Sequence, residues 1–145
     1  EKPSLLLDNA SNLDAIKNIL LGVRLLHYQR PLKGLTVVLG CNNKNMDIEG
    51  LSRALRYFFK KTSGQVIVCP VNGLPSDNGA QSWDVEQVTN DFKSMKIKAR
   101  ASASFNEAFE IAQKSVDERH GLVVITGSSA IINQYWDYKG IKKIV

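Results

Sequence analysis

Short apolar runs alternate along the chain with longer stretches in which apolar residues recur every three or four positions. The short runs are rich in Leu, Val and Ile, as β-strands are. They predict strands at residues 4–8, 35–40, 65–69, 97–101 and 122–126. Three consecutive leucines favour a buried strand at 4–8, and the unbroken apolar run at 122–126 predicts a strand covered on both faces.

The longer stretches have the 3.6-residue period of amphipathic helices, and polar residues that cap helices precede them. Asn12 is expected to cap a helix that runs from Leu13 to about His27, and Asp47 to cap the next one. A third helix is predicted at residues 84–95. The apolar faces of the first two helices consist of Leu13, Ile16, Leu20, Val23 and Leu26, and of Ile48, Leu51, Leu55 and Phe58.

Ser104 begins a fourth predicted helix, with Glu107 placed three residues later as in a capping box. We expect this helix to run to about Arg119, because Gly121 is a typical helix stop. Residues 71–82 are rich in Gly, Pro, Ser and Asn and predict a long loop of the kind that is often functional or mobile. Five strands alternating with five helical stretches predict an α/β fold: a three-layer α/β/α, Rossmann-like domain with a mostly parallel sheet of five or six strands.

The length and composition suit one globular domain, with 145 residues of which 43% are hydrophobic and 23% charged. No apolar run is long enough to cross a bilayer. The first residues lack the pattern of a signal peptide, so we expect a cytoplasmic protein without a membrane partner. The chain does not begin with Met, and we expect it to be part of a longer protein.

The formal net charge of +5 raises the question of a phosphate-rich partner. Lys and Arg are nevertheless scattered among acidic residues, with only short pairs such as Lys60 and Lys61, so we expect a solvated surface and no nucleic-acid partner. Cys41 and Cys69 each end an apolar run, and in a cytosolic protein two reduced thiols are favoured over a disulfide. No further ligands accompany them at zinc-site spacing, so no metal site is predicted.

Three clusters of small polar residues follow predicted strands, at residues 8–12, 40–44 and 126–129. In parallel sheets, ligands bind at the carboxyl ends of the strands, where such loops lead into helices. The free backbone N–H groups of a helix's first turn can there hold an anion or a carboxylate. The competing interpretation is that these residues only cap helices and shape turns, which favours the same residue types.

Several motifs of complete enzymes are absent from the sequence. There is no G-x-x-x-x-G-K-[ST] phosphate loop and no G-x-G-x-x-G after the first strand. His27 and His120 fall near predicted helix ends, and Trp83 and Trp136 are interpreted as packing residues. Because no nucleophile–base constellation can be assembled, we predict that this domain alone contains no catalytic residues and only part of an active site.

With these loops in view, the chain resembles the C-terminal domain of the Mur ligase superfamily, in its folylpolyglutamate/dihydrofolate synthase branch. In that branch a strand ends in Asp-Gly-Ala-His-Asn-Pro, and here residues 5–13 read Leu-Leu-Leu-Asp-Asn-Ala-Ser-Asn-Leu. The family's next strand ends in Gly before an Asp-Lys-Asp loop, and residues 37–47 contain Gly40 and Lys44 in a loop one residue longer. The family's Val-Thr-Gly-Ser is matched at residues 124–128, which read Val-Ile-Thr-Gly-Ser.

The resemblance implies that residues 1–145 are the closing domain of an ATP-dependent ligase that adds glutamate to a folate or dihydropteroate through an acyl phosphate. ATP and Mg²⁺ would be bound mainly by an N-terminal domain outside this chain. The resemblance places Asp8 and Lys44 at the nucleotide, and Ser11, Asn12 and Ser128 at the incoming glutamate. Ser11 stands where the family has His, and a neutral hydroxyl makes weaker hydrogen bonds to a carboxylate than a charged group does.

Two other functions remain open from the sequence. The first is the same domain of a sibling ligase that adds an amino acid to a cell-wall precursor. The second is a non-enzymatic Rossmann-like binding module whose basic surface meets nucleic acid. Clustered Lys and Arg with interleaved aromatic residues would favour the second, and the sequence shows neither.

Overall fold

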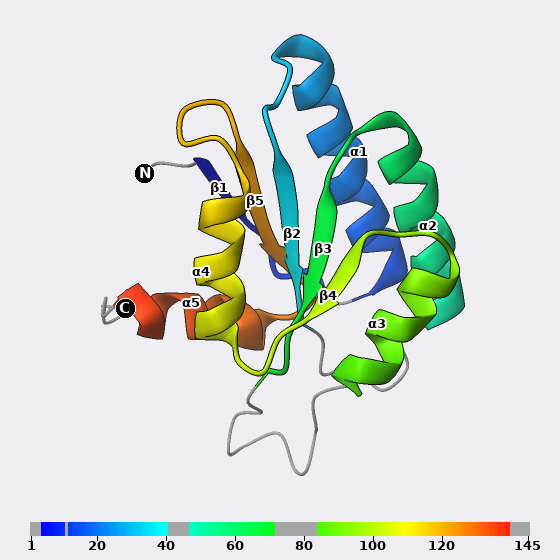
Figure 1. Cartoon of the computed structure of the whole chain (residues 1–145), viewed down its shortest axis with the longest axis vertical. Helices are drawn as coiled ribbons and strands as arrows, with labels where there is room; N and C mark the ends of the chain where they lie inside the picture. Colours follow the sequence, from blue (N-terminus) through cyan, green and yellow to red (C-terminus); the bar gives the residue numbers. More distant parts are fainter. Residues whose placement is uncertain (1–3, 11, 41–46, 72–83, 140–145) are drawn as a thin grey trace.

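The computed structural model describes residues 4–10, 12–40, 47–71 and 84–139 of the chain. In these ranges, strands and helices alternate strictly (Figure 1). The strands are β1 (Ser4–Leu7), β2 (Leu35–Leu39), β3 (Gln65–Val68), β4 (Ala99–Ala101) and β5 (Leu122–Thr126). The helices are α1 (Leu13–Gln29), α2 (Ile48–Lys61), α3 (Val85–Ser94), α4 (Phe105–Ser115) and α5 (Ser129–Lys139). The predicted α/β class and five-stranded sheet are confirmed.

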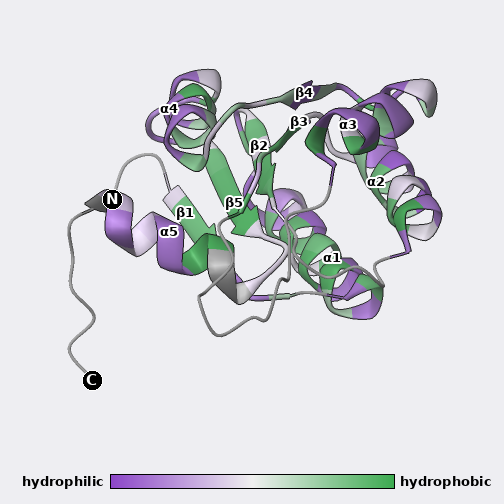
Figure 2. Ribbon diagram, turned by 90° about the horizontal axis from the view of Figure 1, so that it is seen from below, coloured by the Kyte–Doolittle hydropathy of each residue, from purple (hydrophilic) through white to green (hydrophobic). Residues whose placement is uncertain are grey.

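All five strands are parallel and lie in the order β1-β5-β2-β3-β4. β5 is the second strand of the sheet and pairs on both sides, so that Val124 lies opposite Leu6 on one side and Val37 on the other. Strand crossovers are right-handed, so the connections that run from β1 towards β4 all lie on one face, and the return from β4 to β5 lies on the other. Figure 2 accordingly shows α1, α2 and α3 on one side of the sheet and α4 and α5 on the opposite side.

Each face of the sheet has its own hydrophobic core. Alternate residues of a strand point to opposite faces, so Val37 and Val124 pack under α1, α2 and α3, whereas Val38 and Val123 pack under α4 and α5. Phe92 on α3 and Phe109 on α4 are fully buried in these two layers. The three-layer α/β/α architecture follows from this double coverage.

The first strand is not the buried strand that its three leucines predict. β1 lies at the edge of the sheet and pairs only with β5, and its residues Leu5, Leu6 and Leu7 are half-buried. The physical reason is the insertion of β5 between β1 and β2. β5, the last strand in the sequence, occupies the interior position next to β2. No local pattern in residues 4–8 encodes that strand order.

Helix starts follow the sequence closely, and helix ends do not. Asn12, Asp47, Asp84 and Ser104 each accept a backbone N–H of the first turn, which is how N-caps stabilise helices. The capping box at Ser104 is only half formed, because the backbone N–H of Ser104 binds the Ser102 hydroxyl instead.

The fourth helix ends at Ser115, four residues before the predicted end at Arg119, because Val116 is extended and a separate turn follows. In that turn the Asp117 carboxylate accepts the N–H groups of Arg119 and His120. These hydrogen bonds, that of His120 above all, hold the pKa of Asp117 below its usual range. A turn held by the Asp117 carboxylate thus takes the place of the last helical turn that was predicted before Arg119.

The first helix extends past the sheet, and this exposes a residue predicted to be buried. Ile16, Leu20 and Val23 are buried as the helical pattern predicts, but Leu26 is 38% exposed. Figure 1 shows the last turns of α1 beyond the ends of the strands, where no sheet is left to cover them. His27 in this region is structural, because its Nδ1 accepts the backbone N–H of Leu32.

Two further expectations concern single residues and the membrane. Trp136 is half-buried and packs edge-to-face on Tyr135 within the α4–α5 core, as a packing residue should. Trp83 and Cys41 lie outside the described residues. Among the helices of the described ranges, none is long and apolar enough to span a membrane.

Cys69 should make the protein less stable at high pH. The thiol is buried at the end of β3, and burial raises its pKa from the usual 9.0 to about 12. As the pH rises, the thiol ionises in the unfolded chain before it does so in the folded one. Its contribution to the free energy of unfolding is therefore complete below pH 9 and is lost between about pH 9 and pH 12, at about 1.4 kcal/mol per pH unit. Urea unfolding at pH 8, 9, 10 and 11 should show this loss in the wild type and a smaller one in Cys69→Ala. Parallel pH profiles for the two proteins would contradict the prediction.

Candidate functional site

The described residues of the three predicted polar loops lie side by side at the carboxyl edge of the sheet. Because β5 is inserted between β1 and β2, the loops that follow these three strands are neighbours. β5 leads to α5 on one face of the sheet, whereas β1 and β2 lead to α1 and α2 on the other. The strand arrows of Figure 1 point downwards, and Figure 2 is seen from below, so it shows this carboxyl edge. Such a reversal between adjacent connections marks the position at which open parallel sheets bind ligands.

Backbone contacts hold the three loops close together. The N–H of Asp8 donates to the Ile125 carbonyl (N···O 3.0 Å), and the N–H of Gly40 donates to the Thr126 carbonyl (3.1 Å). Gly127 lies so near Gly40 that a Cβ on Gly127 would stand 2.2 Å from the Gly40 carbonyl oxygen. Its φ of +120° is also one that L side chains rarely adopt. This edge of the sheet therefore requires glycine at position 127.

Asp8 directly follows β1 and is half-buried at this edge. Its Oδ2 accepts the backbone N–H of Ala10 at 2.8 Å, so one oxygen shapes the turn into α1. Its Oδ1 makes no hydrogen bond to any of the described residues. The carboxylate is thus held in place by one oxygen while the other remains available to a ligand.

The two described residues that the resemblance places at glutamate both cap helices. Asn12 accepts the N–H of Ala15 (2.9 Å) at the start of α1. Ser128 is buried; its hydroxyl donates to the Gly40 carbonyl (3.1 Å) and accepts the N–H of Ile131 (3.3 Å) at the start of α5. Both side chains therefore have structural duties beside any contact with a ligand.

Ser11 and Lys44, the other two predicted site residues, lie outside the described residues. In the sequence, Ser11 stands between Ala10 and Asn12, and Lys44 is four residues after Gly40. Their assignments to glutamate and to the nucleotide stay predictions.

Thr126, the last residue of β5, lies in the predicted cluster at residues 126–129, but no ligand was predicted for it from the sequence. Its hydroxyl oxygen is buried and has no hydrogen-bond partner among the described residues. Buried hydroxyls are nearly always paired, so an unpaired one between two loops marks a place for water or for a ligand. In the sequence, Thr126 is distinguished only by its place in the Thr-Gly-Ser run, in which the ligand role was assigned to Ser128.

The arrangement is suited to binding rather than to bond-making. α1 and α5 both begin at this edge, and helix N-termini favour anionic groups through their free N–H groups and the helix dipole. Within the described ranges, no cluster of three or more His, Cys, Asp or Glu side chains can hold a metal ion. The described residues thus supply positions for a polar or anionic ligand, together with the Asp8 carboxylate.

Replacing Ser128 should test its structural duty. Ser128→Ala removes two hydrogen bonds in a buried setting, and we expect a loss of about 1–3 kcal/mol in the free energy of unfolding. Ser115→Ala is the matched control, because that hydroxyl is exposed and binds only the carbonyl four residues earlier. Urea unfolding of both variants measures the effect. If Ser128→Ala lowers the free energy of unfolding as little as Ser115→Ala does, the Ser128 hydroxyl has no structural role and only a ligand-binding role is left for it.

Comparison with known proteins shows similarity in fold but not in sequence. No protein-family model matches the chain, and no curated protein matches its sequence. Solved structures do match its fold. One is a bifunctional folylpolyglutamate synthase/dihydrofolate synthase from Yersinia pestis, complexed with AMPPNP and Mn ion, with a TM-score of 0.69, 17% identity and 96% of this chain covered. Another is FolC from E. coli in complex with DHPP and ADP, with a TM-score of 0.71, 16% identity and 95% covered.

These matches confirm the predicted fold, which is that of one part of a folylpolyglutamate/dihydrofolate synthase. The chain spans 29% of the length of each of these two proteins. A third match, E. coli FolC in complex with ADP and without folate substrate, has a TM-score of 0.70 at 18% identity and again covers 29% of that chain. At such identities the likeness establishes the fold and leaves the chemistry to be argued from the site.

Proposed function

We propose that this chain is the C-terminal domain of an ATP-dependent ligase that joins glutamate to a folate or a dihydropteroate. The observation that supports the proposal is that the motifs and the fold agree with the same family. The three loops with the family-like runs are the ones that meet at the ligand edge of the sheet, in a fold shared with synthases solved with ADP or AMPPNP.

In the proposed reaction, a carboxylate of the pteroate or folate attacks the γ-phosphorus of ATP, and ADP leaves. The glutamate amine then attacks the acyl phosphate, and inorganic phosphate leaves as the amide forms. ATP and Mg²⁺ would be bound mainly by an N-terminal domain, and this domain would close over them. Its contribution would be to hold ligands in position, which can supply a large part of a rate enhancement without any catalytic side chain.

In the proposed role, Asp8 and Lys44 face the nucleotide, and the N-terminal turns of α1 and α5 face the glutamate. Helix N-termini suit a substrate whose carboxylates must be held. Ser11 and Ser128 offer neutral hydroxyls beside those turns. Thr126 joins this set because its buried hydroxyl needs a partner.

The test is ADP release by the full-length protein with ATP, Mg²⁺ and glutamate, with and without dihydropteroate or a reduced folate. We expect release that depends on both the pterin substrate and glutamate, together with a glutamylated product identified by mass spectrometry. Release that depends on a cell-wall precursor instead would identify a sibling ligase. Absence of any glutamate-dependent turnover in a folded full-length protein would overturn the proposal.

Asp8→Asn should separate the charge of Asp8 from its turn-forming role. The amide oxygen of Asn can still accept the Ala10 N–H, so stability should change by less than about 0.5 kcal/mol. Loss of a charge-assisted hydrogen bond to the nucleotide should lower kcat/KM for ATP about tenfold.

The matched control for this substitution is Asp117→Asn. Asp117 also accepts a backbone N–H two residues later, but in the turn before β5, at the opposite edge of the sheet. This variant should leave kcat/KM unchanged. Equal kinetic effects in the two variants, or none in either, would remove Asp8 from the nucleotide site.

A further inference from the structure

A groove between α1 and α2 begins beside the proposed ligase site, at Leu13 and Asp47, and extends away from it along the two helices. Its volume is about 570 Å³, within the size range of binding pockets. It extends along α1 from Leu13 to Arg24, which is about 16 Å at the helical rise. Buried Leu20 and Phe58 lie among its lining residues, between the two helices. The groove therefore has the length of a three-turn helix and an apolar floor.

Large exposed apolar side chains gather on these two helices. The side chains in question are Leu21, Leu25, Leu26, Tyr28 and Tyr57. Of these, Leu21 (55% exposed) and Tyr57 (60%) line opposite walls of the groove. Single exposed apolar residues need no explanation, but Leu21 and Tyr57 face each other across one groove, as is typical of an interaction surface.

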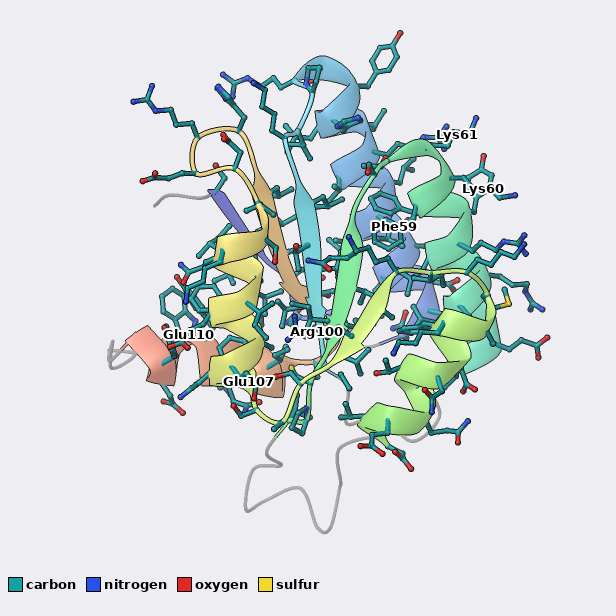
Figure 3. All side chains as sticks on the ribbon, in the orientation of Figure 1. Phe59, Lys60, Lys61, Arg100, Glu107 and Glu110 are labelled. Carbon is teal, nitrogen blue, oxygen red and sulfur yellow. The ribbon has the colours of Figure 1, made fainter. Side chains whose placement is uncertain are left out.

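The charge around the groove is positive. Arg24 crosses from α1 towards α2, with its guanidinium 5.6 Å from the centre of the Tyr57 ring. Within the described part of the chain, no carboxylate forms an ion pair with Arg24 or with Lys17, which also lines the groove. Arg53 also lines the groove but forms an ion pair with Glu49 (2.9 Å), and Asp47 is the one acidic residue among the described residues of the lining. Along α1 and α2, six cations stand against two acids: Lys17, Arg24, Arg53, Arg56, Lys60 and Lys61 against Asp14 and Glu49. Lys60 and Lys61 extend from the last turn of α2 (Figure 3).

From these features we infer that the α1–α2 groove binds an acidic amphipathic helix of a partner protein. An apolar helix face fits a concave apolar floor, and acidic residues flanking that face meet Lys17 and Arg24 of the rim, which have no carboxylate partner among the described residues. A flat bilayer would not fill the groove. The residues of this chain outside the described ranges contain only Glu1 and Asp77 as acids, which do not make an acidic helix. The inference does not depend on the ligase activity.

The orientation of the partner helix follows from the helix dipoles. α1 and α2 both run from the carboxyl edge to the opposite edge, so their negative ends and the cations Lys60 and Lys61 lie together. A helix that runs antiparallel to them brings its positive N-terminal end, where acidic side chains are favoured, to those cations. We therefore expect the partner's acidic residues to be concentrated in its first turns.

The test uses a fluorescein-labelled helical peptide of about 18 residues, with Leu at positions i, i+3, i+4 and i+7 and Glu on both flanks. Fluorescence anisotropy should show saturable binding that weakens as salt is raised, because charge contributes to it. The same peptide with Lys in place of every Glu should bind at least tenfold more weakly. No saturable binding up to about 1 mM peptide, or equal binding of the two peptides, would overturn the inference.

Two matched pairs of variants locate the binding surface. Leu21→Ser in the groove should weaken binding at least tenfold, whereas Leu25→Ser, which is similarly exposed (58%) on α1 but outside the groove, should weaken it less than threefold. Arg53→Glu in the groove and Arg56→Glu outside it form the second pair, on α2. All four side chains are exposed, so thermal melts should confirm that every variant folds.

Two other occupants would give different results. Sedimentation velocity that shows a dimer disrupted by Leu21→Ser but not by Leu25→Ser would mean that a second copy of this chain covers the groove. Cosedimentation with phosphatidylserine vesicles, weakened equally by Leu25→Ser and Arg56→Glu, would mean that this surface contacts a membrane. Either result, like equal effects within both pairs of variants on peptide binding, would overturn the inference of a partner helix.

Discussion

Gly127→Ala should destabilise the protein by at least about 3 kcal/mol, or prevent it from folding. The new Cβ would stand 2.2 Å from the Gly40 carbonyl oxygen, and the φ of +120° is unfavourable for any L side chain. Backbone strain of this kind costs about 1–3 kcal/mol and overpacking about as much again. The whole free energy of unfolding of a natural domain is about 5–15 kcal/mol, so this loss is a large part of the stability. Urea unfolding, or the soluble fraction if folding fails, measures the effect.

The matched control for this substitution is Gly22→Ala. Gly22 is an exposed residue inside α1, and a Cβ there meets nothing within 4 Å. The substitution should stabilise the protein by about 0.5–1 kcal/mol, because alanine favours the helix more than glycine does. If Gly127→Ala proved as harmless as Gly22→Ala, the close approach of the β2 and β5 loops at the ligand edge would be wrong.

Phe109→Ala should cost about 3–5 kcal/mol and loosen α5. Phe109 is fully buried on α4, and its ring centre lies 5.4 Å from that of Tyr135 and 5.1 Å from that of Tyr138, both on α5. Edge-to-face pairs of this kind add to the burial of area. Because Phe109 contacts two rings of α5, its loss should accelerate hydrogen exchange in α5 more than in α1 or α2.

Tyr28→Ala provides the comparison for the loss of an aromatic ring. Tyr28 is 88% exposed at the end of α1, so its removal should change the free energy of unfolding by less than about 0.5 kcal/mol. Urea unfolding combined with amide exchange on both variants measures global and local effects together. If Phe109→Ala left exchange in α5 unchanged, packing on α4 would not be what holds α5 to the sheet.

The local sequence determined the kind of the predicted elements and most of their starts, although the strand predicted at residues 97–101 begins only at Ala99. The strand at Leu122–Thr126 was predicted to the residue, because five consecutive β-favouring residues stand between a glycine and a Thr-Gly-Ser turn. The caps Asn12, Asp47, Asp84 and Ser104 lie where their side chains accept first-turn N–H groups. Capping and strand propensity act over a few residues, so one sequence contains all the information they need.

The tertiary structure alone decided the order of the strands and which of the predicted loops are neighbours. The same local pattern is compatible with β5 at either edge or in the middle, and only its insertion between β1 and β2 makes three loops neighbours and moves β1 to the edge. That insertion also creates the approach of Gly127 to Gly40 and leaves the Thr126 hydroxyl buried without a partner among the described residues. These features depend on contacts between residues about 90 positions apart, which local periodicity does not encode.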